Sequence, residues 1–334
     1  MHMSDALISP EVGLTGIAIA AAVVAYHGMK LDKQEDMLQK LPLIGIMGAF
    51  VFVAQMINFA IPGTGSSGHI AGSLMLAIIL GPSAAIIIIS SILVIQALLF
   101  GDGGILALGT NIINMGIVPC FIIYPLVWKT IVGQNLTRKK VLIASCVAGM
   151  LAMSMGALGV VVETYISGIA QIPLTEFVLL MIPIHVLIGL GEGLITSAVV
   201  WFAMQQNMIQ NDNLTRQPLK KSTVIGAVVG LMIPVIALTW FASSQPDGLE
   251  WSLERSSAQL AEDAPPTAIH QFAQNLQEKT TIMPDYTFGS EAESDTAEQV
   301  NYMLIALIGS MIMVAFLSVI SGGIYLSRRK KIAK

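Results

Sequence analysis

Residues 70–100 read IAGSLMLAIILGPSAAIIIISSILVIQALLF and contain no charged side chain. About 20 consecutive apolar residues are what an α-helix needs to cross the hydrocarbon core of a bilayer. Gly81-Pro82-Ser83 divides the stretch into two candidate membrane segments, 70–80 and 84–100. The first is short enough to be re-entrant, and the second is long enough to span. This stretch therefore predicts an all-α membrane protein.

The rest of the chain has the same character. Hydrophobic residues make up 54% of the 334 residues and charged residues 11%, against roughly 25% charged in a soluble domain. The mean hydropathy is +0.75. No basic region precedes the first apolar run, so no cleaved signal peptide is expected, and Cys120 and Cys146 lie in apolar runs, which predicts buried thiols. Further candidate spans are predicted at 12–28, 41–61, 105–127, 141–162, 174–204, 222–242 and 303–326.

The basic residues predict the orientation. Fifteen of the seventeen lie in four segments, 29–40, 128–140, 205–221 and 327–334. Cytoplasmic loops are enriched in Lys and Arg, so we expect these segments inside the cell. If segment 70–80 did not cross the membrane, Arg138-Lys139-Lys140 would lie outside the cell. We therefore count this segment as a crossing, which gives nine membrane crossings in all. We therefore expect a multi-pass protein whose N-terminus lies outside and whose C-terminus lies in the cytoplasm.

The polar stretch 206–221 is predicted to be a cytoplasmic linker between two units. Residues 1–205 form a body of seven spans. Residues 222–334 form an accessory unit, in which two helices flank an external loop at about 243–302. Eleven acidic residues lie in this loop, and much of it is expected to be poorly ordered alone. Because the linker would let the units fold apart, removal of 222–334 is expected to leave a metal site in the body able to bind.

The first residues, Met1-His2-Met3, offer nitrogen donors for a metal ion. The α-amino group, the deprotonatable amide of residue 2 and the His2 ring can close two fused chelate rings around a small divalent cation. His2 is too bulky for efficient removal of Met1, so the amine is expected to be that of Met1. His69 follows the glycine-rich segment 63–68 and is able to fill the remaining in-plane position. Four nitrogens in a plane favour Ni(II) or Cu(II) over magnesium or calcium.

Four polar residues of the chain are candidate partners for the imidazoles. A metal-bound imidazole usually has its other nitrogen hydrogen-bonded. The candidates are Ser66, Ser67, Asn111 and Asn114. For the two asparagines, hydrogen bonding between helices of the bundle is the alternative. For the glycines at 63–68, the alternative is a tight turn between two spans.

Other classes of function compete with metal capture. Gly63, Gly68 and His69 have the spacing of a phosphate-binding loop, but that motif requires Lys in place of His69 and a strand before it, so no ATP hydrolysis is predicted. His185 and Glu192 lie two helical turns apart on one face of a predicted span. Together with His69 they suggest a metal-dependent intramembrane hydrolase, although no H-E-x-x-H motif is present. A passive metal channel is a further alternative, and no nucleic-acid partner is predicted.

Several motifs resemble one known family. Met1-His2-Met3, GTGSSGHIAG at 63–72, Gly81-Pro82-Ser83 and QALLFGDGGILALGTNIINM at 96–115 resemble the CbiM/NikM family. Its members are the substrate-capture (S) components of energy-coupling-factor transporters for nickel and cobalt. Residues 222–334, with Pro246–Glu250 and Pro284-Asp285-Tyr286, resemble the PDGLE, or NikN-like, accessory component. One departure is the stretch Met3-Ser4-Asp5-Ala6-Leu7 after Met1-His2, where the family usually has aromatic or acidic residues such as Glu-Gly-Phe.

The resemblance implies a seven-helix body that holds the metal through the Met1 amine, the His2 amide and ring, and His69. It implies that this body topples in the membrane, and that ATP is hydrolysed by separate CbiO/NikO-like subunits coupled through a CbiQ/NikQ-like T component. The chain is thus predicted to be no enzyme and to need no cofactor, with Ni(II) or Co(II) as transported substrate. The PDGLE type of accessory unit favours nickel, and cobalt uptake for cobalamin synthesis is the alternative.

Overall fold

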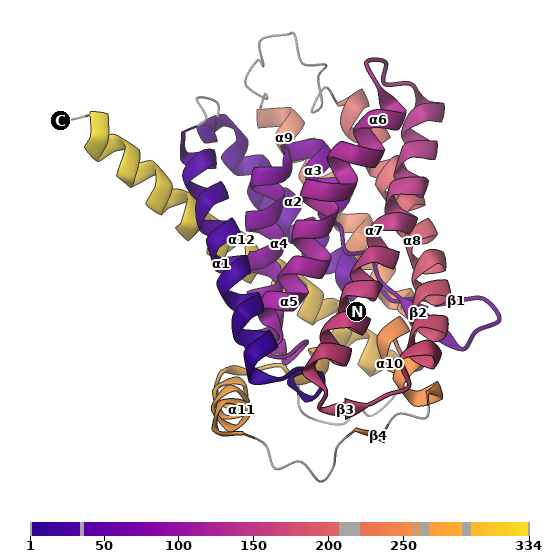
Figure 1. Ribbon diagram of the computed structural model, residues 1–334. Helices are drawn as coiled ribbons and strands as arrows, with labels where there is room; N and C mark the ends of the chain where they lie inside the picture. The colour runs from indigo at the N-terminus through magenta and orange to yellow at the C-terminus, as the bar shows by residue number, and fades with distance from the viewer. Residues whose placement is uncertain are drawn as a thin grey trace.

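The computed structural model describes residues 2–33, 37–206, 221–256, 259–260, 267–288 and 295–332, most of them helical (Figure 1). The body comprises η1 (Asp5–Leu7), α1 (Pro10–Asp32), α2 (Met37–Met56), β1 (Phe59–Ile61), β2 (Ser66–Gly68), α3 (Ser73–Leu80), α4 (Pro82–Ile95), η2 (Gln96–Phe100), α5 (Leu108–Ile112), η3 (Ile113–Trp128), α6 (Lys129–Val132), α7 (Arg138–Ser167), β3 (Ala170–Gln171) and α8 (Leu174–Gln205). The accessory unit comprises α9 (Lys221–Leu238), η4 (Thr239–Phe241), α10 (Gly248–Arg255), β4 (Gln259–Leu260), α11 (Ala268–Thr280), η5 (Pro284–Tyr286) and α12 (Asp295–Ile332).

Six helices within the described ranges are long and apolar enough to cross a membrane. They are Pro10–Asp32, Pro82–Phe100, Leu108–Val132, Arg138–Ser167, Leu174–Gln205 and Thr296–Ile320. Shorter apolar helices cover Leu41–Met56 and Met232–Phe241, where the sequence also predicts spans. The predicted all-α, polytopic membrane fold is confirmed. The count of nine crossings stays a prediction.

The uncertain segment, 70–80, is only partly helical. Its helix α3 has eight residues, or about 12 Å of helix, against about 30 Å of hydrocarbon. The flanking Gly72 and Gly81 have φ of 75° and 87°, a region that glycine adopts without steric cost. All eight side chains of α3 are buried. α3 is therefore an interior half-length helix, and the residues before it lead from the bundle's interior to the β-hairpin.

The glycine-rich segment 63–68 forms a tight turn, which was one of the two interpretations of its glycines. Strands β1 and β2 pair antiparallel, with Phe59 opposite Gly68. Gly63 and Gly65 in the turn both have φ of 77°. In Figure 1 the hairpin projects from the side of the bundle, close to α8 and α10. All three residues of β2 are buried, so the second strand directs the chain inward, and His69 follows it as a further buried residue.

The accessory helices pack closely against the body. α12 lies along α2, and α9 packs against α2 as well. A Cβ atom at Gly309 of α12 would lie 2.2 Å from the Phe52 ring, and one at Gly48 of α2 would lie 2.4 Å from Leu317. Small residues at such positions let membrane helices approach one another. The two predicted units therefore share an extensive helix–helix interface.

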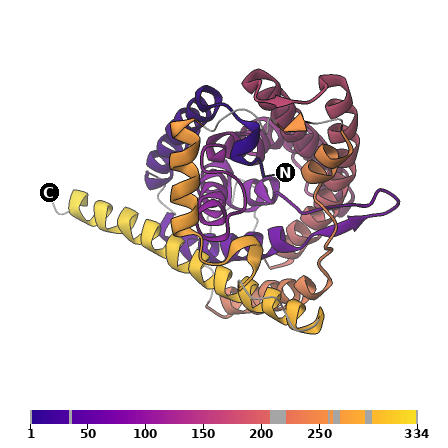
Figure 2. The ribbon, with the colours of Figure 1, turned by 90° about the horizontal axis from the view of Figure 1, so that it is seen from below.

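The segment between α9 and α12 of the accessory unit contains helices α10 and α11, which the sequence did not predict. Asp247 begins α10 as the N-cap of a capping box with Glu250, and Thr267 caps α11. Figure 2 shows α10 and α11 on two sides of the N-terminal segment, at one end of the bundle. Residues 257–258, 261–266 and 289–294 of the loop and 207–220 of the predicted linker lie outside the described residues.

Candidate metal centre

The N-terminal segment is threaded into the bundle and held there by its backbone. Met3 is fully buried, and its N–H donates to Asn111 Oδ1 at 2.8 Å while Asn111 Nδ2 donates back to the Met3 carbonyl at 3.1 Å. The Gly104 N–H donates to the same carbonyl at 2.8 Å. Asp5 accepts a hydrogen bond from the Ala107 N–H at 2.9 Å. These contacts fix residue 3 against the loop 101–107, so the position of His2 is fixed as well.

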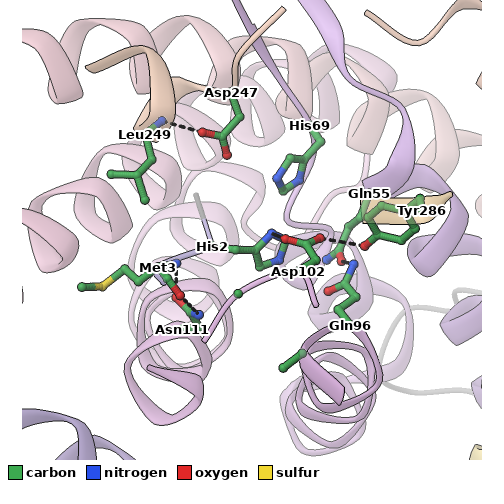
Figure 3. A network of polar contacts seen from close by, with 12 residues as sticks. His2, Met3, Gln55, His69, Gln96, Asp102, Asn111, Asp247, Leu249 and Tyr286 are labelled. Carbon is green, nitrogen blue, oxygen red and sulfur yellow. Dashed lines mark hydrogen bonds and ion pairs between the residues drawn. The ribbon is translucent and has the colours of Figure 1, made fainter. Parts of the chain in front are cut away.

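His2 lies against an acidic residue of that loop. Its Nδ1 is 3.0 Å from Asp102 Oδ1, and its side chain is 7% exposed. The Tyr286 hydroxyl donates to the other carboxylate oxygen of Asp102 at 2.7 Å (Figure 3). The Nε2 atom of His2 is buried and has no hydrogen-bond partner. A buried polar atom without a partner is costly unless it serves a ligand.

His69 faces His2 across the same space. The two imidazoles are nearly parallel, with an interplanar angle of 11° and a centroid distance of 5.2 Å. His69 Nδ1 contacts the Ile70 carbonyl at 3.1 Å. The pKa of His69 is lowered from 6.5 to about 3, mainly by burial. Nearby positive charge, including that of His2, lowers it further. A neutral imidazole has a lone pair available for a metal.

The backbone that carries His69 is anchored from two helices. Glu192 of α8 accepts hydrogen bonds from the N–H groups of Ala71 at 3.2 Å and Gly72 at 3.0 Å. Gln55 of α2 donates to the Ala71 carbonyl at 2.8 Å, and Gln96 donates to Gln55 at 2.9 Å. This chain of hydrogen bonds satisfies an extended segment that interrupts the bundle.

Two carboxylates of this region are held in the charged form. Burial alone raises the pKa of Asp102, but the adjacent His2 and the Tyr286 hydroxyl hold it below its usual range. Burial also raises the pKa of Asp247, while nearby positive charge and hydrogen bonding, including that from the Glu250 N–H, hold it below its usual range. Figure 3 shows Asp247 and Asp102 on opposite sides of the two imidazoles. Such a setting attracts a cation.

Asp247 belongs to the Pro246–Glu250 motif, whose residues begin α10 and hold it against α8. Its Oδ1 accepts hydrogen bonds from the Leu249 and Glu250 N–H groups at 2.8 and 2.9 Å. A Cβ atom at Gly248 would lie 2.9 Å from His185 and from Ile188 of α8. Glycine therefore lets the start of α10 press directly against α8, which brings Asp247 over His69.

The four polar candidates have other partners. Ser67 donates from Oγ to the Gln245 carbonyl at 2.6 Å and from N–H to the Pro246 carbonyl at 2.8 Å. Ser66 Oγ reaches the Ser67 carbonyl at 3.1 Å and the Pro246 carbonyl at 3.4 Å. Asn111 clamps Met3, and Asn114 donates to Glu163 at 2.7 Å. The imidazole contacts described above come instead from Asp102 and the Ile70 carbonyl, while Met1 lies outside the described residues.

Comparison with known proteins now identifies the chain. Residues 2–209 match the CbiM family, described as the cobalt uptake substrate-specific transmembrane region. The chain belongs to this family. Residues 220–326 match the PDGLE domain. The predicted resemblance is confirmed for both units, and this CbiM-family chain is a member of the nickel and cobalt transport proteins, which work with other membrane and ATPase components.

Similar proteins have the same fused organisation. The putative fused nickel transport protein NikMN of Archaeoglobus fulgidus is 30% identical over 94% of this chain and 96% of its own length. The fused nickel transport protein NikMN of Rhodobacter capsulatus is 28% identical over 98% and 99%. A solved structure of a truncated transition metal transporter is 32% identical, with a TM-score of 0.54, over 61% of this chain and 99% of that one. A second transition metal transporter is 30% identical, with a TM-score of 0.55, over 63% and 95%.

These relatives are transporters, so the CbiM-family chain is a transport protein and not an enzyme. The hydrolase alternative also lacks a suitable arrangement of residues. Glu192 serves the backbone of Ala71 and Gly72, and His185 Nδ1 contacts the Met181 carbonyl at 2.7 Å. Within the described ranges, no three His, Cys, Asp or Glu side chains are placed to hold a metal together.

Sequence reasoning missed three residues around the imidazoles: Asp102, Asp247 and Tyr286. All three lie in motifs that carry the family resemblance, Asp102 in the 96–115 stretch and the others in the accessory unit. Asp102 follows Gly101, which has φ of 69°, and an acidic residue among glycines at the end of a span was an available signal. For Asp247 and Tyr286, only the folded arrangement reveals the contact.

Proposed function

We propose that this chain captures Ni(II) on the extracytoplasmic side of a prokaryotic plasma membrane, as the S component of an energy-coupling-factor transporter. Co(II) is the alternative substrate. The metal is held by the Met1 amine, the amide and ring of His2, and the ring of His69. A T component and ATPase subunits on the cytoplasmic side supply the energy for uptake, and the N-terminus lies outside and the C-terminus inside.

The observation that carries this proposal is the buried, nearly parallel pair of imidazoles of His2 and His69, 5.2 Å apart. Because a metal–imidazole bond is about 2 Å long, two rings that share one ion have centroids roughly 4–6 Å apart. The contact of His69 Nδ1 with the Ile70 carbonyl leaves Nε2 for the metal. Among the described histidines, His2 and His69 are the pair whose rings stack on each other, while His27 contacts Tyr26 and Phe121.

Metal binding requires a change at His2. The chelate ring that runs from the His2 amide through Cα, Cβ and Cγ is completed by Nδ1, which here contacts Asp102 at 3.0 Å. A half-turn of the ring about the Cβ–Cγ bond releases Nδ1 to the metal and moves Nε2 to the side of Asp102. Asp102 then accepts from Nε2–H, as carboxylates do for metal-bound histidines. The imidazole has nearly the same outline in both orientations.

The choice of nickel over cobalt is supported by chemistry and by the relatives. Four nitrogens in a plane suit Ni(II). Relatives that match this chain over most of its length are named nickel transport proteins. Relatives named for cobalt match a shorter part, as the Geobacter sulfurreducens protein CbiM does over 60% of this chain.

Metal analysis of the untagged protein tests the proposal. The protein is purified after growth with equal nickel and cobalt, and a second preparation carries a tag fused before Met1. We expect about one nickel per untagged chain and none in the N-terminally tagged form, whose amine is blocked. Equal metal in both preparations would show that the amine is not a ligand. Cobalt in the untagged protein would favour the alternative substrate.

A further inference from the structure

Asp102 joins the body of the protein to the accessory unit. One carboxylate oxygen contacts His2 Nδ1 at 3.0 Å, and the other accepts the Tyr286 hydroxyl at 2.7 Å. Asp102 and Tyr286 are 184 positions apart in the sequence. The carboxylate therefore has a partner on each side, and the angle it presents to His2 depends on a residue of the accessory unit.

The backbone at Tyr286 indicates that its position is imposed. Asp285 and Tyr286 have φ of 48° and 57°, and no other non-glycine residue of the described ranges has a positive φ. Side chains disfavour this region, and residues held there cluster at functional sites. The strained turn directs the Tyr286 ring onto Phe100, at a centroid distance of 4.8 Å. From there the hydroxyl reaches Asp102.

The segment that carries Tyr286 is fastened to the same loop as Asp102. The N–H groups of Ile282 and Met283 donate to the Leu99 carbonyl at 3.0 and 3.1 Å. Gln277 of α11 donates to the carbonyls of Ala97 and Gly103 at 3.0 and 2.7 Å. The accessory segment thus brackets residues 97–103, which shape the turn around Asp102.

We propose that Tyr286 of the accessory unit is a positioning residue for metal capture: its hydroxyl orients the Asp102 carboxylate, and Asp102 orients the His2 imidazole. This inference rests on the proposed function of His2 as a ligand. Tyr286 touches no metal itself. The accessory unit is then a structural part of the capture site, and its docking sets the affinity of the site.

The test compares two tyrosines of one aromatic cluster. Tyr286→Phe keeps the ring on Phe100 and removes only the hydroxyl. Tyr302→Phe is the matched control, because Tyr302 lies edge-on to Tyr286, at a centroid distance of 6.2 Å, and donates to the Met56 carbonyl instead. Ni(II) affinity is measured by calorimetry on the full-length, untagged chain. The visible absorption of bound Ni(II), which depends on its ligand geometry, is a second readout.

We expect Tyr286→Phe to weaken Ni(II) binding about tenfold or more, as loss of a partner behind a ligand typically does, and to shift the absorption. Tyr302→Phe should resemble the wild type in both readouts. In the Asp102→Asn background, Tyr286→Phe should cause no further loss, because the tyrosine acts through the carboxylate.

Wild-type affinity and absorption for Tyr286→Phe would overturn the inference, as would an equal loss in Tyr302→Phe or an undiminished loss in the Asp102→Asn background. Thermal unfolding of the metal-free variants reports whether they fold. Failure of the underlying function gives a different result, since His2→Ala would then bind Ni(II) like the wild type.

Discussion

Each of the two facing imidazoles is held by one acceptor through its Nδ1 atom. Asp102 contacts His2 at 3.0 Å and the Ile70 carbonyl contacts His69 at 3.1 Å. These contacts set the direction of each ring, and both imidazole side chains are buried. The metal-capture proposal therefore depends on the side chains of His2 and His69, and substitution of either one tests it.

His2→Ala and His69→Ala should each abolish high-affinity Ni(II) binding, because either loss leaves an incomplete chelate. His27→Ala is the matched control, since His27 stacks on Phe121 and contacts Ser83 away from the site. Calorimetry with Ni(II) on the three untagged variants measures the effect. Wild-type affinity in either of the first two would refute the ligand assignment, provided that the His27 variant also binds normally.

The low pKa of His69 predicts how the metal-free protein responds to acid. Its pKa is about 3 in the folded protein against an ordinary value of 6.5, so the unfolded chain binds the proton more readily. Stability is therefore lost as the pH falls from about 6.5 toward 3, and it is unaffected by this group at higher pH. Thermal unfolding of the metal-free protein, from about pH 8 to pH 4, should show a smaller acid loss in His69→Gln. Parallel curves for the two proteins would contradict this.

At this scale the sequence predicted two candidate donors that the structure places face to face, but not the groups that their Nδ1 atoms contact. His2 and His69 stand in recognisable motifs, and the structure brings them face to face. Ser66, Ser67, Asn111 and Asn114 are polar residues of the motifs, which made them candidate imidazole partners. Backbone groups and distant residues compete for such side chains, and each of the four is engaged there.

Among the elements, the buried residues between β2 and α3 have no regular secondary structure to satisfy their backbone. Their backbone cannot be satisfied by a helix, and buried N–H groups without partners are costly. Glu192 of α8 accepts from two of them, Ala71 and Gly72. Its burial in a helix that faces His69 thus has a structural explanation and needs no hydrolytic chemistry.

Glu192→Gln should lower Ni(II) affinity about tenfold, because the amide cannot accept from both N–H groups as the carboxylate does, and the backbone behind His69 loosens. Glu163→Gln is the control, since Glu163 is a carboxyl of α7 that accepts from Asn114. Calorimetry and thermal unfolding of both variants decide the question. An equal effect of the two substitutions would indicate general destabilisation instead of a specific anchor.

The long helices were predictable because apolar composition alone specifies a membrane span. The short length of α3 could not be predicted in this way, because its eight apolar residues are followed directly by Gly81-Pro82 and another apolar run. Helices α10 and α11 were missed for the opposite reason. They lie in a polar, acidic segment, and their signals are local caps at Asp247 and Thr267.

On the scale of the whole molecule, the two units meet at the site. The body supplies His2, His69 and Asp102, and the accessory unit supplies Asp247 and Tyr286 around them (Figure 3). The polar linker predicted two units able to fold apart, and composition gives no information on how such units dock. The contact between Tyr286 and Asp102 spans 184 positions, which no local pattern encodes.

Removal of residues 222–334 tests this arrangement. The body should still fold, because the similar truncated transition metal transporter matches only 61% of this chain and 99% of its own length. The sequence alone predicts that the truncated chain still binds metal but supports less transport, since all four proposed donors precede residue 70. The structure instead predicts Ni(II) affinity lower by about tenfold or more, because Asp102 loses Tyr286 and the loop of His69 loses the backbone contacts of Ser67 with Gln245 and Pro246.

Equilibrium Ni(II) binding to the truncated and full-length proteins measures the effect on affinity. Uptake of radioactive nickel with the partner subunits present measures the effect on transport. Unchanged affinity with reduced uptake would assign the accessory unit to coupling or loading, and unchanged affinity with full uptake would make it dispensable. Weakened affinity restored by adding the separate accessory unit would establish that docking, and not the covalent linker, completes the site.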